Sequence, residues 1–145
     1  MTTGAGGSAE SYLSENGSLA YLGAFEATGI NAAGQVIGYR ATPLLDLRGL
    51  LWQAGGSSEI GSPGDRILPR DINNAGQVVG SMWRNGYSER AFVWEDGLTR
   101  DLNDSVSTDS GWELQGATGL NNAGQIVGYG QQDGEERAFI MTREW

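Results

Sequence analysis

Short stretches of alternating apolar and polar residues, separated by turn-forming residues, run along most of this chain. One nine-residue string occurs three times: INAAGQVIG at 30–38, INNAGQVVG at 72–80 and LNNAGQIVG at 120–128. Within it, Asn and Gly favour a tight turn, because Asn bonds to nearby backbone and Gly adopts a positive φ. The β-branched residues on both sides favour strands. Each string therefore predicts two antiparallel strands joined by a turn, with a bulge or a close backbone approach at Gly38, Gly80 and Gly128.

A second apolar block follows each string. The three blocks are Arg48-Gly49-Leu50-Leu51-Trp52, Arg90-Ala91-Phe92-Val93-Trp94 and Arg137-Ala138-Phe139-Ile140-Met141. They predict a buried third strand, with Phe92, Val93, Trp94, Phe139 and Ile140 in the core between units. After the first two blocks a glycine turn leads into a fourth strand, for example at 98–102. The string repeats after 42 residues (Asn31 to Asn73) and after 48 (Asn73 to Asn121), which is typical of a repeated supersecondary unit.

The repeats predict one all-β domain over residues 11–145, preceded by a flexible tail over 1–10. Its four-stranded antiparallel units span approximately 24–66, 67–114 and 115–145. Residues 11–23 are expected to complete the last unit, because SENGSLAYLG at 14–23 is similar to WEDGLTRDLN at 94–103. A unit shared between both ends of a chain closes a circular fold and removes exposed sheet edges. Propeller-like blades, possibly six from two chains, fit this pattern, and a β-trefoil is the alternative.

Composition limits the chemistry that the chain can perform. The 145 residues include no Cys and no His, and all nine basic residues are Arg. Thiolate nucleophiles, imidazole bases and Schiff-base lysines are therefore excluded, and neither a cofactor nor a metal is expected. The formal net charge of −9 makes nucleic acid and anionic membranes unfavourable partners.

The chain shows no apolar run of membrane-spanning length, and its first residues lack the basic and apolar segments of a secretory signal. These features predict a cytoplasmic protein, or an exported one if the sequence is a mature form.

Positions at which the units differ are the candidates for function. Asp71 stands where the other units have glycine, it follows Arg70, and Ser81 replaces the tyrosines at 39 and 129. The candidate catalytic residues are Asp71, Arg70, Tyr39 and Tyr129. The candidate ligand-binding residues are Tyr39, Trp83, Tyr87, Tyr129 and Trp112, because aromatic side chains near loops can line a small-molecule pocket.

The combined pattern, GINxxGQVVGY followed by RAFVWxxGxxxDL, resembles the HAF repeat, which occurs in tandem in many bacterial proteins predicted to be exported. The resemblance covers nearly the whole chain, from about Tyr12 to Trp145. The second and third units depart from it, with Arg-Ala-Phe in place of the His-Ala-Phe that names the family. The resemblance implies β-rich, propeller-like repeats, and it supplies neither a settled activity nor a catalytic residue.

The sequence leaves three functions open. The first is a homodimeric module that binds a small, largely apolar molecule, or a protein partner, through loops at one end of the ring. The second is a small cofactor-free enzyme that catalyses cyclisation or isomerisation of an apolar substrate, as in secondary metabolism. Such reactions can depend on orientation and a few hydrogen bonds. The third is a structural assembly subunit.

Overall fold

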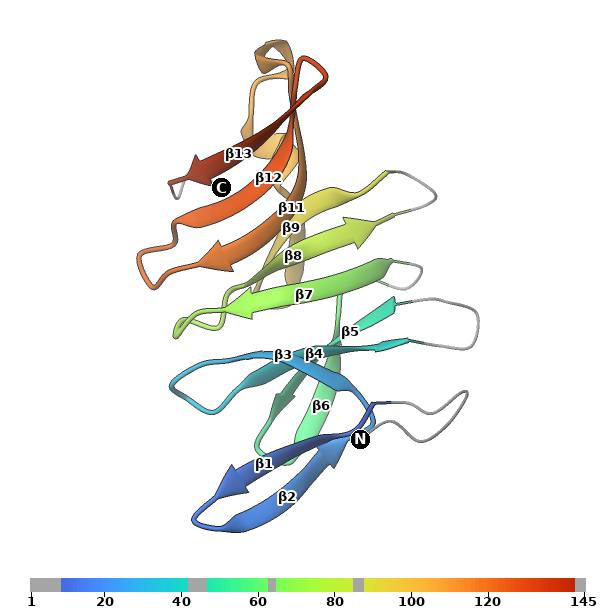
Figure 1. Cartoon of the computed structure of the whole chain (residues 1–145), viewed down its shortest axis with the longest axis vertical. Coiled ribbons are helices and arrows are strands. Elements are labelled where there is room, and N and C mark those ends of the chain that lie inside the picture. The colour runs from blue at the N-terminus through green and yellow to red at the C-terminus, as the bar shows by residue number, and fades with distance from the viewer. Residues whose placement is uncertain (1–8, 42–46, 63–64, 85–87, 143–145) are drawn as a thin grey trace.

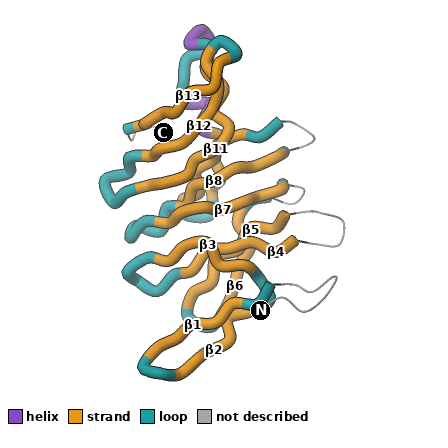
Figure 2. Tube along the Cα trace, viewed as in Figure 1, coloured by secondary structure: helices purple, strands orange, loops and turns teal. Residues whose placement is uncertain are grey.

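The computed structural model describes residues 9–41, 47–62, 65–84 and 88–142. These residues form antiparallel strands in four separate sheets, which follow one another along the long axis of the molecule (Figures 1 and 2). The predicted all-β class is confirmed. The strands are β1 (Ser11–Glu15), β2 (Ser18–Gly23), β3 (Glu26–Ile30), β4 (Val36–Ala41), β5 (Leu47–Gln53), β6 (Gly56–Ile60), β7 (Arg66–Ile72), β8 (Val78–Trp83), β9 (Arg90–Glu95), β10 (Leu98–Asp101), β11 (Trp112–Leu120), β12 (Ile126–Gln132) and β13 (Glu135–Met141).

Helical structure in the described residues is limited to two single-turn 3-10 helices, η1 (Leu102–Ser105) and η2 (Thr108–Ser110), between β10 and β11. No helix in this part of the chain is long and apolar enough to cross a membrane.

Each repeat forms one sheet. Unit one consists of β3–β6, unit two of β7–β10 and unit three of β11–β13, and in each the strands pair in chain order. The predicted four-stranded unit is therefore present twice. Strands β1 and β2 pair only with each other among the described strands, and they lie at the opposite end of the molecule from unit three (Figure 1). One chain alone thus does not form the predicted closure of unit three by residues 11–23.

The repeated string forms the same turn in every unit. Its glycines, Gly34, Gly76 and Gly124, have φ values of 78°, 81° and 83°, as predicted from the sequence. In unit two the side chain of Asn73 closes the turn: Oδ1 accepts from the backbone N–H groups of Ala75 and Gln77 at 3.1 and 3.0 Å. In each unit the first strand, which leads into the turn, contains a bulge. The bulged residues are Thr28, Arg70 and Thr118.

The mid-strand glycine after each turn permits the close backbone approach expected from the sequence. A Cβ atom added to Gly80 would collide with the carbonyl oxygen of Leu68 in β7, and equivalent collisions occur at Gly38 and Gly128. The second strand of each unit can therefore lie tightly against the bulged first strand only with glycine at this position.

Successive units pack face to face through their first strands. Strand β7 contacts β3, β4 and β5, and β11 contacts β7, β8 and β9, whereas β6 and β10 pack mainly within their own units. Two cores result. The first includes Ile37 and Leu51 of unit one with Ile67 and Ile72 of unit two, and the second includes Val79 and Val93 of unit two with Leu114 and Ala117 of unit three. In both interfaces the first strand of the following unit therefore lies across the first three strands of the preceding one.

The expectation that Ile140 belongs to the core is wrong: this side chain is 74% exposed. It lies on the face of unit three that no described strand covers.

Hydrogen bonds also join the turns of successive units, in a row that we call the Asn column. Asn31 Nδ2 donates to the carbonyl of Asn73 at 3.0 Å, and Asn73 Nδ2 donates to the carbonyl of Asn121 at 3.0 Å. Each of these side chains thus stabilises its own turn and also joins that turn to the turn of the following unit by a hydrogen bond.

Replacing Asn73 with Ala is expected to lower the free energy of unfolding by about 2–3 kcal/mol, because a buried turn loses several hydrogen bonds and retains unpaired donors. Asn122→Ala is the control. Asn122 is exposed, and its side chain accepts one hydrogen bond, from the N–H of Asn74 at 2.8 Å, so its loss should cost about 1 kcal/mol or less. Urea denaturation measures both values, and an equal or larger loss for Asn122→Ala would contradict the role given to Asn73 in the Asn column.

Candidate functional site

Four polar side chains meet between units two and three, and we call them the Arg70 cluster. They are Arg70 on β7, Ser81 on β8, Glu89 just before β9 and Tyr129 on β12. The hydroxyl groups of Tyr129 and Ser81 both donate to Glu89 Oε2, at 2.5 and 2.6 Å. The guanidinium of Arg70 donates to Ser81 Oγ and, at 3.2 Å, to the hydroxyl oxygen of Tyr129.

The cluster exists because unit two departs from the repeat. Arg70 occupies the bulge position that holds Thr28 and Thr118 in the other units, and Ser81 occupies a tyrosine position. The guanidinium carbon lies 5.6 Å from the centroid of the Tyr129 ring, a favourable cation–π distance. Across the sheet, Gly116 leaves space for that ring, since a Cβ atom there would overlap it.

The charges of the cluster are balanced but remain accessible. Arg70 and Glu89 approach to 3.6 Å, and each side chain is 25% exposed. A guanidinium has five N–H groups, and those of Arg70 make only two hydrogen bonds to described residues. Donors therefore remain for a further acceptor.

A hollow of about 380 Å³ lies next to the cluster and shares Tyr129 with it. Its other lining residues come from all three strands of unit three: Gln115, Gly130, Glu136, Arg137 and Ala138. The carbonyl oxygen of Gln115 lies 3.2 Å from Ser81 Oγ, as an alternative acceptor for the single hydroxyl proton that Ser81 shares with Glu89, and this contact links the hollow to unit two. The lining thus combines one aromatic ring with polar groups of both charges.

Of the candidates taken from the sequence, the structure brings Arg70 and Tyr129 together. Asp71 lies beside Arg70 in the chain, but both of its carboxylate oxygens accept from backbone. Oδ1 accepts from the N–H of Ile72 at 2.9 Å, and Oδ2 accepts from the N–H of Leu120 at 2.9 Å. In this structure Asp71 connects the first strands of units two and three.

The remaining candidates lie elsewhere. Tyr39 donates to Glu26 at 2.5 Å within unit one, and this hydrogen bond, together with burial and the charge of Glu26, raises the pKa of the Tyr39 hydroxyl. The ring of Trp83 is 5.8 Å from the guanidinium of Arg66. Tyr87 lies outside the described residues.

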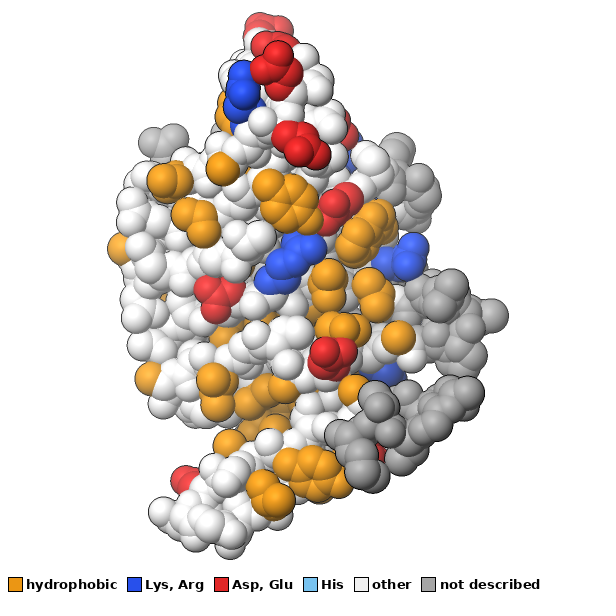
Figure 3. Space-filling model, viewed as in Figure 1, with side chains coloured by type: hydrophobic (Ala, Val, Ile, Leu, Met, Phe, Trp, Pro, Cys, Tyr) orange, Lys and Arg blue, Asp and Glu red, His pale blue; other side chains and the backbone are white. Residues whose placement is uncertain are grey.

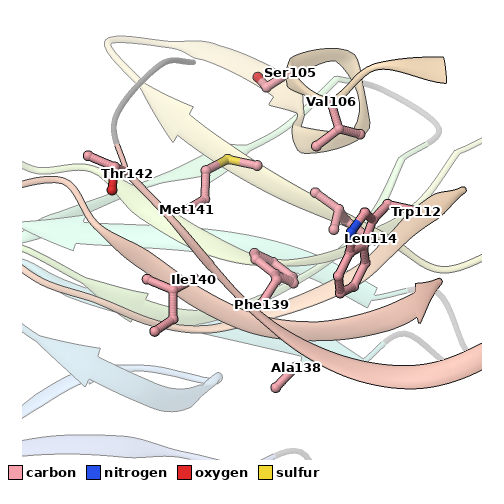
Figure 4. A pocket seen from close by; sticks show the side chains of 9 residues that line it. All are labelled: Ser105, Val106, Trp112, Leu114, Ala138, Phe139, Ile140, Met141 and Thr142. Atoms are coloured by element: carbon pink, nitrogen blue, oxygen red, sulfur yellow. The ribbon is translucent and has the colours of Figure 1, made fainter. Parts of the chain in front are cut away.

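Trp112 lines a second, larger groove of about 580 Å³, shown in Figure 4. Its ring meets that of Phe139 edge to face, with centroids 6.4 Å apart. The other lining residues are Ser105, Val106, Leu114, Ala138, Ile140, Met141 and Thr142. The groove follows the edge of β13 that pairs with no described strand, whereas in unit two the equivalent edge of β9 pairs with β10.

Sequence reasoning missed Glu89 as a site residue. A signal was present, because Glu89 precedes the repeated Arg90 and unit one has Leu47 in the same place. Nothing in the local pattern, however, indicates that this carboxylate meets residues from two units.

Among the described residues, no group of three or more His, Cys, Asp or Glu side chains is arranged to hold a metal ion. No known protein family, curated protein or solved structure matches this chain. The geometry of the Arg70 cluster and of the two hollows is therefore the basis for assigning a function.

One ion pair gives unit two a pH-dependent stability. Arg84 Nε lies 3.0 Å from Asp65 Oδ1, and the Asp65 side chain is only 4% exposed. Burial alone would raise the pKa of Asp65. The hydrogen bonds from Arg84 and from the N–H of Ser62, with the charge of Arg84, outweigh it and lower that pKa.

Asp65→Asn is therefore expected to reduce the free energy of unfolding by about 1–2 kcal/mol at neutral pH. A lowered carboxylate pKa stabilises the fold above the unfolded value of about 3.9, and this contribution disappears as the pH falls through the folded pKa. The difference between wild type and variant should accordingly shrink below about pH 4 in urea denaturation series. The exposed Asp109→Asn is the control, and a difference that stays constant down to pH 2 would contradict the assignment.

Proposed function

We propose that this chain is a small-molecule-binding module built from propeller-type units, with its ligand in the hollow beside the Arg70 cluster. One observation carries this proposal: residues at which unit two departs from the repeat converge on Tyr129, next to that hollow. Residues that only maintain the scaffold recur in all units, as the Asn and Gly turn residues do. Arg70 and Ser81 do not recur, so the repeat alone does not require them.

The hollow and the adjoining Arg70 cluster indicate the chemistry of the ligand. Tyr129 lines the hollow and offers a flat apolar surface. Arg70 does not line the hollow itself, but it lies against Tyr129 and retains N–H groups for an acceptor such as a carbonyl or hydroxyl oxygen. A volume of about 380 Å³ falls within the usual range of small-molecule sites. A small, largely apolar molecule with at least one hydrogen-bond acceptor fits these features.

We further propose that the units are blades of a propeller-type ring rather than lobes of a β-trefoil. All described strand pairs lie within units, and a closed barrel would require strands to pair between units. The packing of the first strand of each following unit across the first three strands of the preceding unit also supports this arrangement. Six units from two chains would complete such a ring. Membership of the HAF-repeat family remains a prediction.

A cofactor-free cyclase or isomerase is the second candidate function. The placement of the Tyr129 hydroxyl favours it, because this group lies 3.2 Å from a nitrogen of Arg70 and 2.5 Å from an oxygen of Glu89. A phenol held between a cation and a carboxylate can hold or pass a proton while the hollow orients the substrate.

Arg70→Thr tests the ligand site, because it installs the residue that units one and three have at this position. We expect a folded protein that loses its bound molecule when it is purified gently from its natural source and weighed by native mass spectrometry. Tyr129→Phe, which removes one hydroxyl, should weaken retention roughly tenfold. Arg100→Ala, at an exposed position of β10, is the control. Identical retention in all three variants would contradict the site.

For the enzyme, the same Tyr129→Phe variant separates binding from chemistry. Retained binding with lost turnover of the identified molecule would favour catalysis, whereas a molecule that is bound and never converted would favour the binding module.

A further inference from the structure

The outer face of unit three exposes residues that are buried in the other units. In unit two, Val79 and Val93 lie beneath the first strand of the next unit, with exposures of 0% and 1%. Val127 and Ile140 hold the same repeat positions in unit three and are 42% and 74% exposed. No described strand covers them. This face therefore repeats an internal interface of the protein with one partner missing.

The missing partner has a counterpart at the other end of the same chain. Strand β7 packs on unit one through Ile72, which is 5% exposed, next to the buried Pro69. In β3 the same repeat positions are Ile30, 59% exposed, and Ala27, also exposed. At these two positions β3 presents the side chains that β7 and β11 use for packing, and both are exposed. The start of the same surface is already covered, because Phe25 is buried in a cluster on which Leu22 packs and the N–H of Ala27 donates to Ser11 Oγ.

We propose that β3 of a second copy packs on the face of unit three formed by Val127 and Ile140, as β7 packs on unit one. Each copy has both surfaces, so two copies joined at two such seams form a closed ring of six units. The contact joins two different surfaces and is heterologous, and a heterologous contact gives a ring where its rotation closes. This inference rests on the propeller-type arrangement proposed above and does not depend on the ligand site.

The Asn column provides a second, polar argument for the same seam. Asn31 and Asn73 each donate to the Gln of their own turn and to the Asn carbonyl of the next unit. Asn121 donates to Gln125 at 2.9 Å and to no other described residue. At the seam, the carbonyl of Asn31 in the second copy is the equivalent acceptor.

The seam is not identical to the internal interfaces. The backbone N–H of Ala32 donates to Asn74 Oδ1 at 2.9 Å, and that of Asn74 donates to Asn122 Oδ1 at 2.8 Å. The N–H of Asn122 would face Ala32 of the second copy, which has no side-chain oxygen. The seam between copies would therefore have one hydrogen bond between turns, whereas each internal interface has two.

The β1–β2 hairpin belongs to this seam as well. Its turn residues Asn16 and Gly17 have φ values of 52° and 81°, and Asp96 and Gly97, between β9 and β10, have 52° and 82°. The hairpin therefore repeats the third and fourth strands of a unit. Its Leu22 packs on the core of unit one, at the repeat position of the buried Leu102 in unit two.

In the ring, β13 already occupies the third-strand place of unit three. The hairpin of the second copy then lies along the unpaired edge of β13, beside the groove in Figure 4. Gly23, with a φ of 147° that side chains rarely adopt, links the hairpin to unit one. Figure 3 shows hydrophobic side chains at the end of the molecule that the hairpin forms. The exposed large hydrophobic side chains of β1 and β2 are Tyr12, Leu19 and Tyr21, and they suit the apolar side chains that line part of that groove.

Sedimentation velocity on the full chain tests the proposal through two opposite surfaces. We expect the wild type at twice 15.4 kDa, and both Ile140→Glu and Ile30→Glu at 15.4 kDa, because each buries a charge at both seams. Leu98→Glu, an equally exposed leucine on β10, is the matched control and should remain a dimer. Circular dichroism of each variant verifies that it is folded, and the exposed positions make this the expected result.

Mixing the two charged variants tests the head-to-tail geometry. Each variant keeps one intact surface, so the mixture should recover a two-copy species held by a single seam. A monomeric wild type, a dimer that Ile30→Glu leaves intact, or species that grow beyond two copies would each overturn the proposal.

The proposal of the ligand site and the proposal of the ring can be contradicted independently of each other. Arg70→Thr leaves both seam surfaces unchanged and should remain a dimer, because the Arg70 cluster lies between units two and three of one copy. A monomeric wild type that still retains its small molecule would overturn the ring alone.

Discussion

Units one and two of this protein depend on the first strand of the following unit to cover their apolar faces. Ile37 and Leu51 of unit one are buried only because β7 lies on them, and Val79 and Val93 of unit two are buried by β11. A single four-stranded sheet cannot bury such a face alone, so repeat proteins gain stability from contacts between neighbours. This requirement accounts for the bulge and the mid-strand glycine. They bring the first two strands together and shape the strand that packs on the preceding unit.

Because the scaffold uses the repeated residues, the exceptions to the repeat become informative. Arg70 and Ser81 place a cation and a hydroxyl at the interface of units two and three, where Glu89 and Tyr129 bind them. Half-buried charges of this kind are tolerated when they are paired and hydrogen-bonded. Asp71 already links the same two units through backbone, so the Arg70 cluster is not the only polar tie between them. Its accessible position and unused donors support the proposed ligand site.

Local chemistry made the turns and close approaches predictable from the sequence. The positive φ of Gly76 follows from a short Asn-x-x-Gly turn, and the packing of Gly80 against Leu68 follows from a glycine in a β-favouring stretch. Arg70 could be selected as a candidate because it differs from the residue at the same position of the other units. Tyr129 could be selected because it occupies a repeated position at which unit two has Ser81. Their contact, and the participation of Glu89, could not be foreseen, since 59 residues separate Arg70 from Tyr129 and the tilt between units decides which side chains meet. Ile140 was misplaced for a related reason: its pattern is that of a core residue, but burial requires a neighbouring unit.

The same dependence on a neighbour makes the proposed seam the weak point of the proposed ring. An internal interface joins units of one chain, so its strength does not vary with protein concentration, whereas a seam between copies follows mass action. The seam also has one Asn-column bond fewer, and it replaces the buried Pro69 with the smaller Ala27. Opening at a seam would expose Val127 and Ile140, whereas the hollow beside Tyr129 is lined by residues of unit three alone. In this arrangement the proposed seam and the interface between units two and three use the same strand packing, and only the interface between units two and three carries the unit-specific residues Arg70 and Ser81.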